Sequence, residues 1–249
     1  IHSGARYLVA SQNETWSRFP YALYLNDITS RSPEEQAKWM VDQYFSSLDG
    51  YPKTMSVFDL KHTTALSQSI DSLAEVLIST ASTNKVTIQS AFSLAQKFDY
   101  DYDLDIGDEE GYVDLGDFSK ELIKKFPNSE VSQKAQSVLD ILNGNQGPFV
   151  LYERHQGNIG STDDIQVSLD RASGLSIYLP LGEDDPGLGF YTPNHPGFAA
   201  STVWDTFIFK VIGFQPGAPD ENFAGGRGNG NSPQPQPIKQ KVYLPIVSR

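Results

Sequence analysis

The sequence predicts an α/β fold in which helices and strands alternate along one large domain. Stretches with apolar residues at helical spacing are separated by short runs of strand-forming residues, and this alternation favours a layered α/β structure over a helical bundle. Of the 249 residues, 39% are hydrophobic, which is enough for a substantial core. We place the domain at residues 1–214, a linker at 215–240 and an apolar tail at 241–249.

The first part of the domain begins with a strand and a capped helix. Residues 5–11 form an apolar run bounded by polar residues, which is typical of a short strand. Ser32 is followed by Pro33 and, three residues after the serine, by Glu35, the pattern of a helix start. Apolar residues then continue on one helical face to residue 48, and residues 54–60 predict a second strand.

Several helices and two strands are predicted farther along the chain. Apolar residues recur three and four apart within 66–77, 87–98, 115–126 and 129–142, and each stretch predicts a separate helix. Ser129 is suited to cap the last of these, and Asn143 with Gly144 to end it. Residues 149–152 and 175–180 predict strands, and Ser201 is suited to cap a final helix that reaches residue 211.

The composition changes after residue 214. Residues 215–240 are rich in Pro, Gly, Asn and Gln, so they cannot bury enough apolar area to offset their ordering entropy, and we expect an extended linker. The tail at 241–249 is apolar again, and we expect it to dock at a sheet edge because Pro245 does not suit a central strand.

Charge and residue counts exclude several classes of function. The formal net charge is −12, which repels phosphate backbones and anionic membranes. The chain has no cysteine, so it carries no disulfide, no zinc–thiolate site and no cysteine nucleophile. No apolar run is long enough for a transmembrane helix, and no serine-hydrolase, zinc-protease or phosphate-loop motif occurs. The start at Ile1 leads us to expect one piece of a cut or truncated protein.

An acidic run in the middle of the chain is a candidate calcium site. Carboxylates fall at positions 1, 3, 5, 7 and 12 of the calcium-loop pattern. These residues are Asp99, Asp101, Asp103, Asp105 and Glu110. The glycine that the pattern requires at position 6 is replaced by Leu104, so the run fits either an irregular calcium site or a solvated acidic loop.

Four segments, taken in order, resemble the clostripain family of cysteine peptidases, which belongs to the clan of caspases, gingipains and legumain. They are Tyr7-Leu8-Val9-Ala10-Ser11 with Trp16 and Pro20-Tyr21 downstream, the capped helix 32–48 followed by Met55-Ser56-Val57-Phe58-Asp59-Leu60, then Tyr112-Val113-Asp114-Leu115-Gly116-Asp117-Phe118, and Ser173-Gly174-Leu175-Ser176-Ile177-Tyr178-Leu179-Pro180. The resemblance covers about residues 5–214 and implies the C-terminal portion of a caspase-like three-layer α/β/α sandwich.

The resemblance also implies a function. It implies a Cys/His dyad on an upstream, light-chain-like segment, so this chain holds no catalytic residue and should be inactive alone. It further implies an endopeptidase of peptide or protein substrates, secreted or at the cell surface of a bacterium, that cleaves after a basic residue. The calcium dependence of clostripain favours the calcium interpretation of the acidic run. The rival hypothesis is a non-catalytic extracellular binding or adhesion module.

The segment after the first strand is the candidate substrate-binding region. Ligands meet the C-terminal ends of strands in open α/β sheets, and the resemblance places a substrate-pairing loop here. The candidate residues are Ala10, Ser11, Gln12, Glu14, Trp16 and Arg18. Trp16 suits a pocket wall or simple packing under the loop. Glu14 and Asp27 are the local candidate carboxylates for a basic substrate, with an acid on the upstream segment as the alternative. An inward Arg18 would instead favour acidic substrates. His2 lies nearest by sequence to the expected active site, and a loop or surface position is its simpler interpretation; the other three histidines are expected to be structural or solvent-facing.

Overall fold

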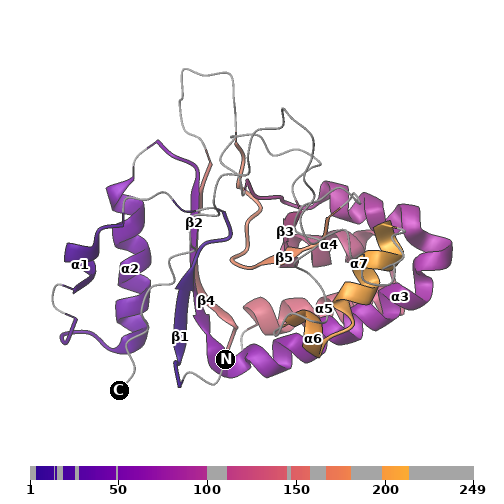
Figure 1. Cartoon of the computed structure of the whole chain (residues 1–249), viewed down its shortest axis with the longest axis horizontal. Helices are drawn as coiled ribbons and strands as arrows, with labels where there is room; N and C mark the ends of the chain where they lie inside the picture. Colours follow the sequence, from indigo (N-terminus) through magenta and orange to yellow (C-terminus); the bar gives the residue numbers. More distant parts are fainter. Residues whose placement is uncertain are drawn as a thin grey trace, which may run out of the picture.

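A three-stranded antiparallel sheet stands between two groups of helices in the part of the chain that the computed structural model describes (Figure 1). The described residues are 4–13, 15, 19–25, 28–48, 50–99, 111–144, 147–157, 167–180 and 198–212. The predicted linker and tail at 215–249 lie outside these ranges. The layers are therefore helix, sheet and helix, as predicted.

The sheet contains β1 (Tyr7–Ala10), β2 (Lys53–Asp59) and β4 (Val150–Gln156), in the order β1-β2-β4 within the described residues. Both neighbours run antiparallel to β2, and the β2–β4 register shifts between Val57 and Phe58. Every residue of β2 is buried because helices cover both faces of the strand, whereas all four residues of β1 are half-buried.

One face of the sheet is covered by α1 (Tyr21–Leu25) and α2 (Pro33–Ser47). The α2 helix begins with the predicted capping box, in which Ser32 and Glu35 bond each other's backbone N–H groups. Its buried face packs against Met55 and Val57 of β2 in one hydrophobic cluster. The period-two alternation of the strand therefore sends odd-numbered residues of β2 toward α2.

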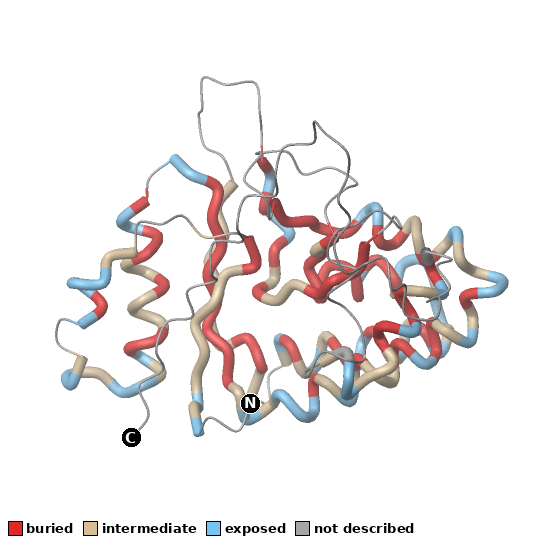
Figure 2. The backbone as a smooth tube through the Cα atoms, in the orientation of Figure 1, coloured by how far each residue is buried: buried red, intermediate tan, exposed pale blue. Residues whose placement is uncertain are grey.

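The opposite face is covered by a larger group of elements that is rich in buried residues (Figure 2). These residues form the main hydrophobic core. The group consists of a 3₁₀ turn (Leu60–His62), α3 (Thr63–Leu94), α4 (Leu115–Lys125), α5 (Glu130–Asn143), α6 (Phe198–Ser201) and α7 (Trp204–Ile212), with a small antiparallel pair of β3 (Tyr112–Asp114) and β5 (Ser176–Tyr178). Phe58 of β2 and Leu8 of β1 contribute to this core from the sheet.

The two helices predicted at 66–77 and 87–98 lie within α3 up to its end at Leu94, and they meet at a kink at Asn84, where φ is −122° and ψ is 16° and the backbone is not helical. The break between them is therefore confirmed, although no loop separates the two helices. The intervening residues include no glycine or proline to stop a helix, and Ala81 and Ile88 continue its buried side. The helix ends at Leu94, so Phe98 lies beyond it and packs with Val167, Leu169 and Ala172.

Two other boundaries also differ from the predictions. Ser201 ends α6 and does not cap the last helix, and the backbone N–H of Val203 before α7 is instead bonded by Asp71 Oδ1 at 2.7 Å. The strand β3 was not predicted, because its three residues merge in sequence with the start of α4. None of the described helices is long and apolar enough to cross a membrane.

Candidate functional site

The predicted substrate-facing segment begins at the C-terminal end of β1. Ala10 is the last residue of the strand, and Ser11 and Gln12 follow directly and are half-buried and buried, respectively. The other predicted residues of this segment, Glu14, Trp16 and Arg18, lie outside the described residues, as do Asp27 and His2. The local geometry therefore concerns the base of the predicted loop.

Thr54 of β2 holds the chain just after β1 through one hydroxyl oxygen. The backbone N–H groups of Gln12 and Asn13 donate to Thr54 Oγ1 at 2.9 and 3.0 Å, and Ser11 Oγ lies 2.8 Å from the same atom. Because the two N–H donors occupy both lone pairs of that oxygen, the hydroxyl hydrogen of Thr54 points to Ser11. The Ser11 hydroxyl therefore accepts this bond and keeps its own hydrogen for a ligand or water.

The side chain of Gln12 reaches in the other direction, to the start of α4. Its Nε2 donates to Asp114 Oδ2 at 2.7 Å, and its Oε1 accepts from the backbone N–H of Gly174 at 3.2 Å. Gln12 is only 9% exposed. The end of β1 is thus tied to β2 through its backbone and to α4 and the segment before β5 through its side chain.

Asp114 is a fully buried carboxylate with four donors. Its Oδ1 accepts from the backbone N–H of Asp117 at 2.7 Å and from the Ser173 hydroxyl, and its Oδ2 accepts from the Ser173 N–H at 2.6 Å and from Gln12. Burial raises the pKa of Asp114 above its ordinary value, and the four hydrogen bonds oppose that rise. Four donors and no acceptor around the two oxygens match the ionised carboxylate, which accepts at both.

A second polar layer fixes the segment that precedes β5. Gln96 Nε2 donates to the carbonyl of Ser168 at 2.9 Å, while its Oε1 accepts from the N–H of Arg171 at 3.3 Å. The Arg171 guanidinium lies 3.1 Å from Asp117 Oδ2, which also accepts from the N–H of Gln96 at 2.8 Å. Because Asp117 and Gln96 are themselves buried, this segment is held against α3 and α4 before it reaches Gln12.

Two buried polar atoms beside these contacts have no hydrogen-bond partner among the described residues. They are Asn13 Oδ1 and Ser56 Oγ, and the two residues are 6% and 1% exposed. An unpaired buried acceptor costs free energy, so each such atom calls for an explanation such as a bound water or ligand. Asn13 precedes the remainder of the predicted substrate loop, so its amide oxygen suits a donor group brought by a ligand.

His155 lies at the same end of the sheet. It is opposite Thr54 in the β2–β4 register, so the two side chains share a face, and its Nδ1 is 2.9 Å from Glu153 Oε2. His62 lies at the far end of β2, with Nε2 4.0 Å from Asp59 Oδ2. Of these two, only His155 is placed near the base of the loop, and the sequence alone offered no signal for this.

The outer edge of β1 is open within the described residues. There the strand pairs with β2 alone. Just before β1, the carbonyl of Arg6 accepts from the N–H of Leu60, so the backbone groups of Arg6 point toward β2. Backbone groups alternate in direction along an antiparallel strand, so those of Tyr7 and Val9, one and three residues later, point away from β2. The edge is formed by Tyr-Leu-Val-Ala and carries no charge or proline that would discourage pairing with another strand.

The predicted calcium site lies mostly outside the described residues. Of its five carboxylates only Asp99 is described, and it is 3% exposed; Asp101, Asp103, Asp105 and Glu110 are not described. The described residues contain no group of three or more potential metal ligands. Calcium binding therefore stays a prediction.

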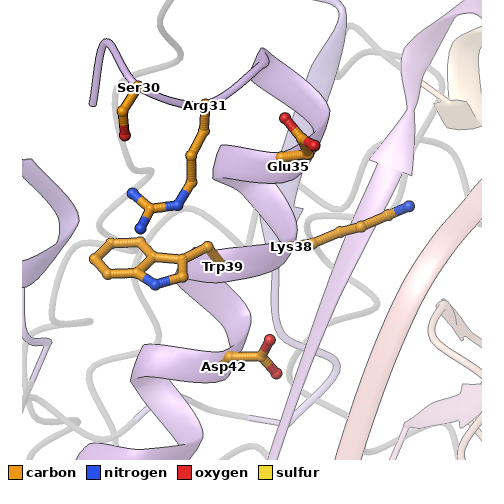
Figure 3. A pocket seen from close by; sticks show the side chains of 6 residues that line it. All are labelled: Ser30, Arg31, Glu35, Lys38, Trp39 and Asp42. Carbon is orange, nitrogen blue, oxygen red and sulfur yellow. The ribbon is translucent and has the colours of Figure 1, made fainter. Parts of the chain in front are cut away.

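A separate shallow pocket of about 370 Å³ lies on α2 (Figure 3). The guanidinium of Arg31 stacks over the indole of Trp39 at 4.3 Å, and two basic and two acidic side chains line the pocket together. Asp42 is already bonded by Tyr152 and Arg154 at 2.8 and 2.9 Å. No predicted site residue lines this pocket, and its mixed charges select no ligand class.

The sequence alone did not identify Thr54, Asp114 and Gly174 as site residues. Asp114 and Gly174 stood inside segments that carried the family resemblance, but nothing in a single sequence shows that residues 102 and 162 positions from Gln12 meet it. Thr54 was predicted only as part of a strand.

Comparisons with known proteins agree with this architecture. The model of the clostripain family, Peptidase_C11, matches residues 1–209. The structure is similar to that of an inactive zymogen C11 protease from Parabacteroides distasonis, with a TM-score of 0.55 and 16% identity over 79% of this chain and 51% of that one. It is also similar to a clostripain from Bacteroides thetaiotaomicron in complex with a peptide inhibitor, with a TM-score of 0.44 and 18% identity over 79% and 76% of the two chains.

The chain thus spans about half the length of the zymogen that it resembles. A comparison with curated proteins found no match.

Proposed function

The chain belongs to the clostripain family of peptidases, and from this premise we propose that it forms the substrate-facing portion of a cysteine endopeptidase. The chain has no cysteine, so the nucleophile of such an enzyme must lie on another segment. We propose that an upstream segment supplies both the cysteine and the histidine of the dyad. In this proposal the present chain contributes half of the core and the loop that follows β1.

The observation that carries the proposal is that β1 has a fixed C-terminal end and an open outer edge within the described residues. Its C-terminal end is fixed by Thr54 and by Asp114, and its outer edge offers the N–H and carbonyl groups of Tyr7 and Val9 to a further strand. The opposite edge of the described sheet, β4, contains Glu153 and Arg154, charged residues that discourage strand addition. The contrast between the two edges supports docking of the upstream segment at β1.

We propose a peptide substrate with a basic residue before the scissile bond. An acidic protein attracts cationic ligands, and the net charge of this chain is −12. The unpaired Asn13 Oδ1 at the base of the loop suits an N–H donor from such a residue. Glu14 and Asp27 remain the proposed carboxylates of the pocket, with Trp16 as its wall.

Two substitutions at Val9 test the docking surface. Val9→Pro removes the outward N–H and leaves the pairing of β1 with β2 intact, because proline is tolerated on an open strand edge. Val9→Thr changes the side chain but keeps the N–H and is the matched control. We expect the proline variant to bind the upstream segment at least tenfold more weakly than the threonine variant by calorimetry. Equal affinities for the two variants would contradict docking at β1.

A covalent probe tests the dyad. A peptidyl chloromethyl ketone with arginine at the reactive end should label the upstream segment only when this chain is present, as read by intact mass spectrometry. Labelling that does not depend on this chain would remove its proposed role in substrate binding. Competition by a lysine peptide but not by an aspartate peptide would support the proposed basic preference.

We further propose that calcium binds the acidic run that begins at Asp99, and that the enzyme acts outside the bacterial cell. A ligand that binds only the folded state raises the free energy of unfolding by RT ln(1 + [L]/Kd), so the unfolding temperature rises with the ligand concentration. Calcium should therefore raise the unfolding temperature of the chain, and magnesium should not replace it. Family membership favours the peptidase over the adhesion-module hypothesis. Detection of the processed chain in culture supernatant would support the proposed location.

A further inference from the structure

The side-chain amide of Gln12 is held in a single orientation. Its Nε2 faces a carboxylate oxygen of Asp114, which can only accept, and its Oε1 faces the N–H of Gly174, which can only donate. A 180° rotation of the amide would place oxygen against oxygen and N–H against N–H. The amide therefore fixes the position of Gln12 relative to both partners.

We propose that Asp114 is a positioning residue for the substrate loop: through the amide of Gln12 it sets where the chain leaves β1. The inference rests on the proposed function of that loop and names a residue outside the loop that fixes its position. Asp114 contacts no substrate in this account and takes no part in bond cleavage.

Asp114 is suited to this role because rigid elements fix its own position. It is the last residue of β3 and the N-cap of α4, and it is fully buried. Ser173 approaches it with both its N–H and its hydroxyl. This approach needs the glycine at position 116, because a Cβ there would overlap Ser173 Oγ. A displacement of Asp114 would disturb α4 itself, so the carboxylate is a stable reference point for the loop.

The loop depends on few other contacts at its base. Among the described residues, Thr54 is the acceptor for the backbone N–H groups of both Gln12 and Asn13, and these two bonds to one atom leave the backbone free to rotate toward or away from α4. The bond from Gln12 to Asp114 supplies the second constraint. A misplacement of about 1 Å in a group that orients substrate costs about 100-fold in rate, so the second constraint has a large expected effect on turnover.

Asp114 also caps α4, and this structural role must be distinguished from its contact with Gln12. The two contacts use different oxygens of the carboxylate. Capping of α4 uses Oδ1, which accepts from Asp117, whereas the contact with Gln12 uses Oδ2. Asp114→Asn can keep an oxygen toward Asp117 while presenting an NH₂ group to the NH₂ of Gln12. The substitution therefore preserves the cap, breaks the contact with Gln12 and also removes the acceptor of the Ser173 N–H, a loss that Gln12→Glu cannot restore.

The experiment uses the complete peptidase, with this chain and its upstream segment together. We expect Asp114→Asn to lower kcat/KM for an arginine peptide by about 10- to 100-fold. Adding Gln12→Glu in the same protein reverses the polarity of the bridge, because the introduced carboxylate accepts from the introduced amide and still accepts from Gly174. The double variant should recover at least half of the lost activity on a logarithmic scale.

Ser173→Ala is the control within the same network. It removes one hydroxyl donor to Asp114 Oδ1 and leaves Gln12 untouched, so we expect kcat/KM to change less than threefold even where stability falls. If Asp114→Asn leaves kcat/KM unchanged, or if Gln12→Glu fails to rescue a folded double variant, the positioning role is refuted. If Ser173→Ala lowers kcat/KM as much as Asp114→Asn, the network acts through stability alone and the role is also refuted.

Hydrogen exchange on this chain separates failure of the inference from failure of the proposed function. Asp114→Asn should speed exchange of the Gln12 and Asn13 amides at least tenfold while the amides of α5 keep their rates, and Gln12→Glu should reverse the change. If this pattern holds but the complete protein hydrolyses no peptide, Asp114 positions the loop and the peptidase proposal is wrong. If exchange at Gln12 and Asn13 does not change, the positioning role is wrong whatever the activity.

Discussion

Gly174 tests whether the segment before β5 packs against the sheet as closely as the structure shows. Its φ is +107°, a backbone conformation that L side chains rarely adopt, and its N–H bonds Gln12. A Cβ at this position would lie 2.6 Å from Val150 Cγ1 and 3.2 Å from Ser56 Oγ. Valine is restricted at χ1, so Val150, which is 7% exposed, cannot turn this methyl group away. Gly174→Ala therefore combines backbone strain with a steric clash.

The two contributions can be estimated separately. Forcing a residue with a Cβ into positive φ costs about 1–2 kcal/mol, and overpacking a filled site costs about 1–3 kcal/mol more. We expect Gly174→Ala to lower the free energy of unfolding by about 2–5 kcal/mol. Gly50 is the matched control: its φ is +80° and a Cβ there would meet nothing within 4 Å. Gly50→Ala should cost only the strain, about 1–2 kcal/mol.

Urea unfolding followed by circular dichroism measures these differences. Val150→Ala alone should cost about 1.6 kcal/mol for two lost methyl groups, at about 0.8 kcal/mol each. In the double variant the clash is gone, so the combined loss should be smaller than the sum of the single losses by about 1–3 kcal/mol. If Gly174→Ala costs no more than Gly50→Ala, or if the two substitutions at Gly174 and Val150 are additive, the close approach of the segment to β4 is wrong.

Three further predictions concern stability. Ser32→Ala removes the cap of α2 and should lower the free energy of unfolding by about 1 kcal/mol in the same urea experiment, and no change would contradict the observed capping box. Trp204→Phe removes the 2.8 Å bond from the buried indole to the carbonyl of Tyr178 and leaves a cavity, so we expect a loss of about 2–4 kcal/mol by thermal unfolding. Burial alone raises the pKa of Asp59, but the N–H and ammonium of Lys61 outweigh it and hold that pKa below its ordinary value. Ionised Asp59 therefore stabilises the fold above about pH 4, the ordinary pKa of a free aspartate, and this contribution is lost as the pH falls through the lower folded pKa. Asp59→Asn should therefore make the free energy of unfolding fall less steeply at acid pH. An unchanged acid limb of the stability–pH curve would contradict this prediction.

Local signals in the sequence predicted the elements that rely on local chemistry. The start of α2 at Ser32 was found because a capping serine and the glutamate three positions later form a box within one turn, and that of α5 at Ser129 was found from the capping serine itself. The short strand at Tyr7 was found because apolar residues bounded by polar ones suit a sheet. These contacts span a few residues, so a single sequence contains all the information that they need.

The contacts that build the site span much longer separations. Gln12 meets Asp114 and Gly174, and Thr54 meets Asn13, only after β1 and β2 pair and α4 packs beside them. The break expected between two helices is present only as a kink at Asn84, because both halves of α3 pack in the same core and no loop separates them. Polar residues there are weak breakers when tertiary packing favours the helix. The open edge of β1 likewise appears only once the sheet order is known.

The central claim is that this chain supplies the substrate-binding half of a peptidase whose nucleophile lies upstream. The most direct test measures hydrolysis of a fluorogenic arginine peptide by this chain alone, by the upstream segment alone, and by the two mixed in equal amounts. We expect no turnover above buffer for either alone, and turnover in the mixture that Val9→Pro abolishes and Val9→Thr retains. Full activity of the upstream segment by itself, or an inactive mixture in which the two are shown to be bound, would contradict the claim.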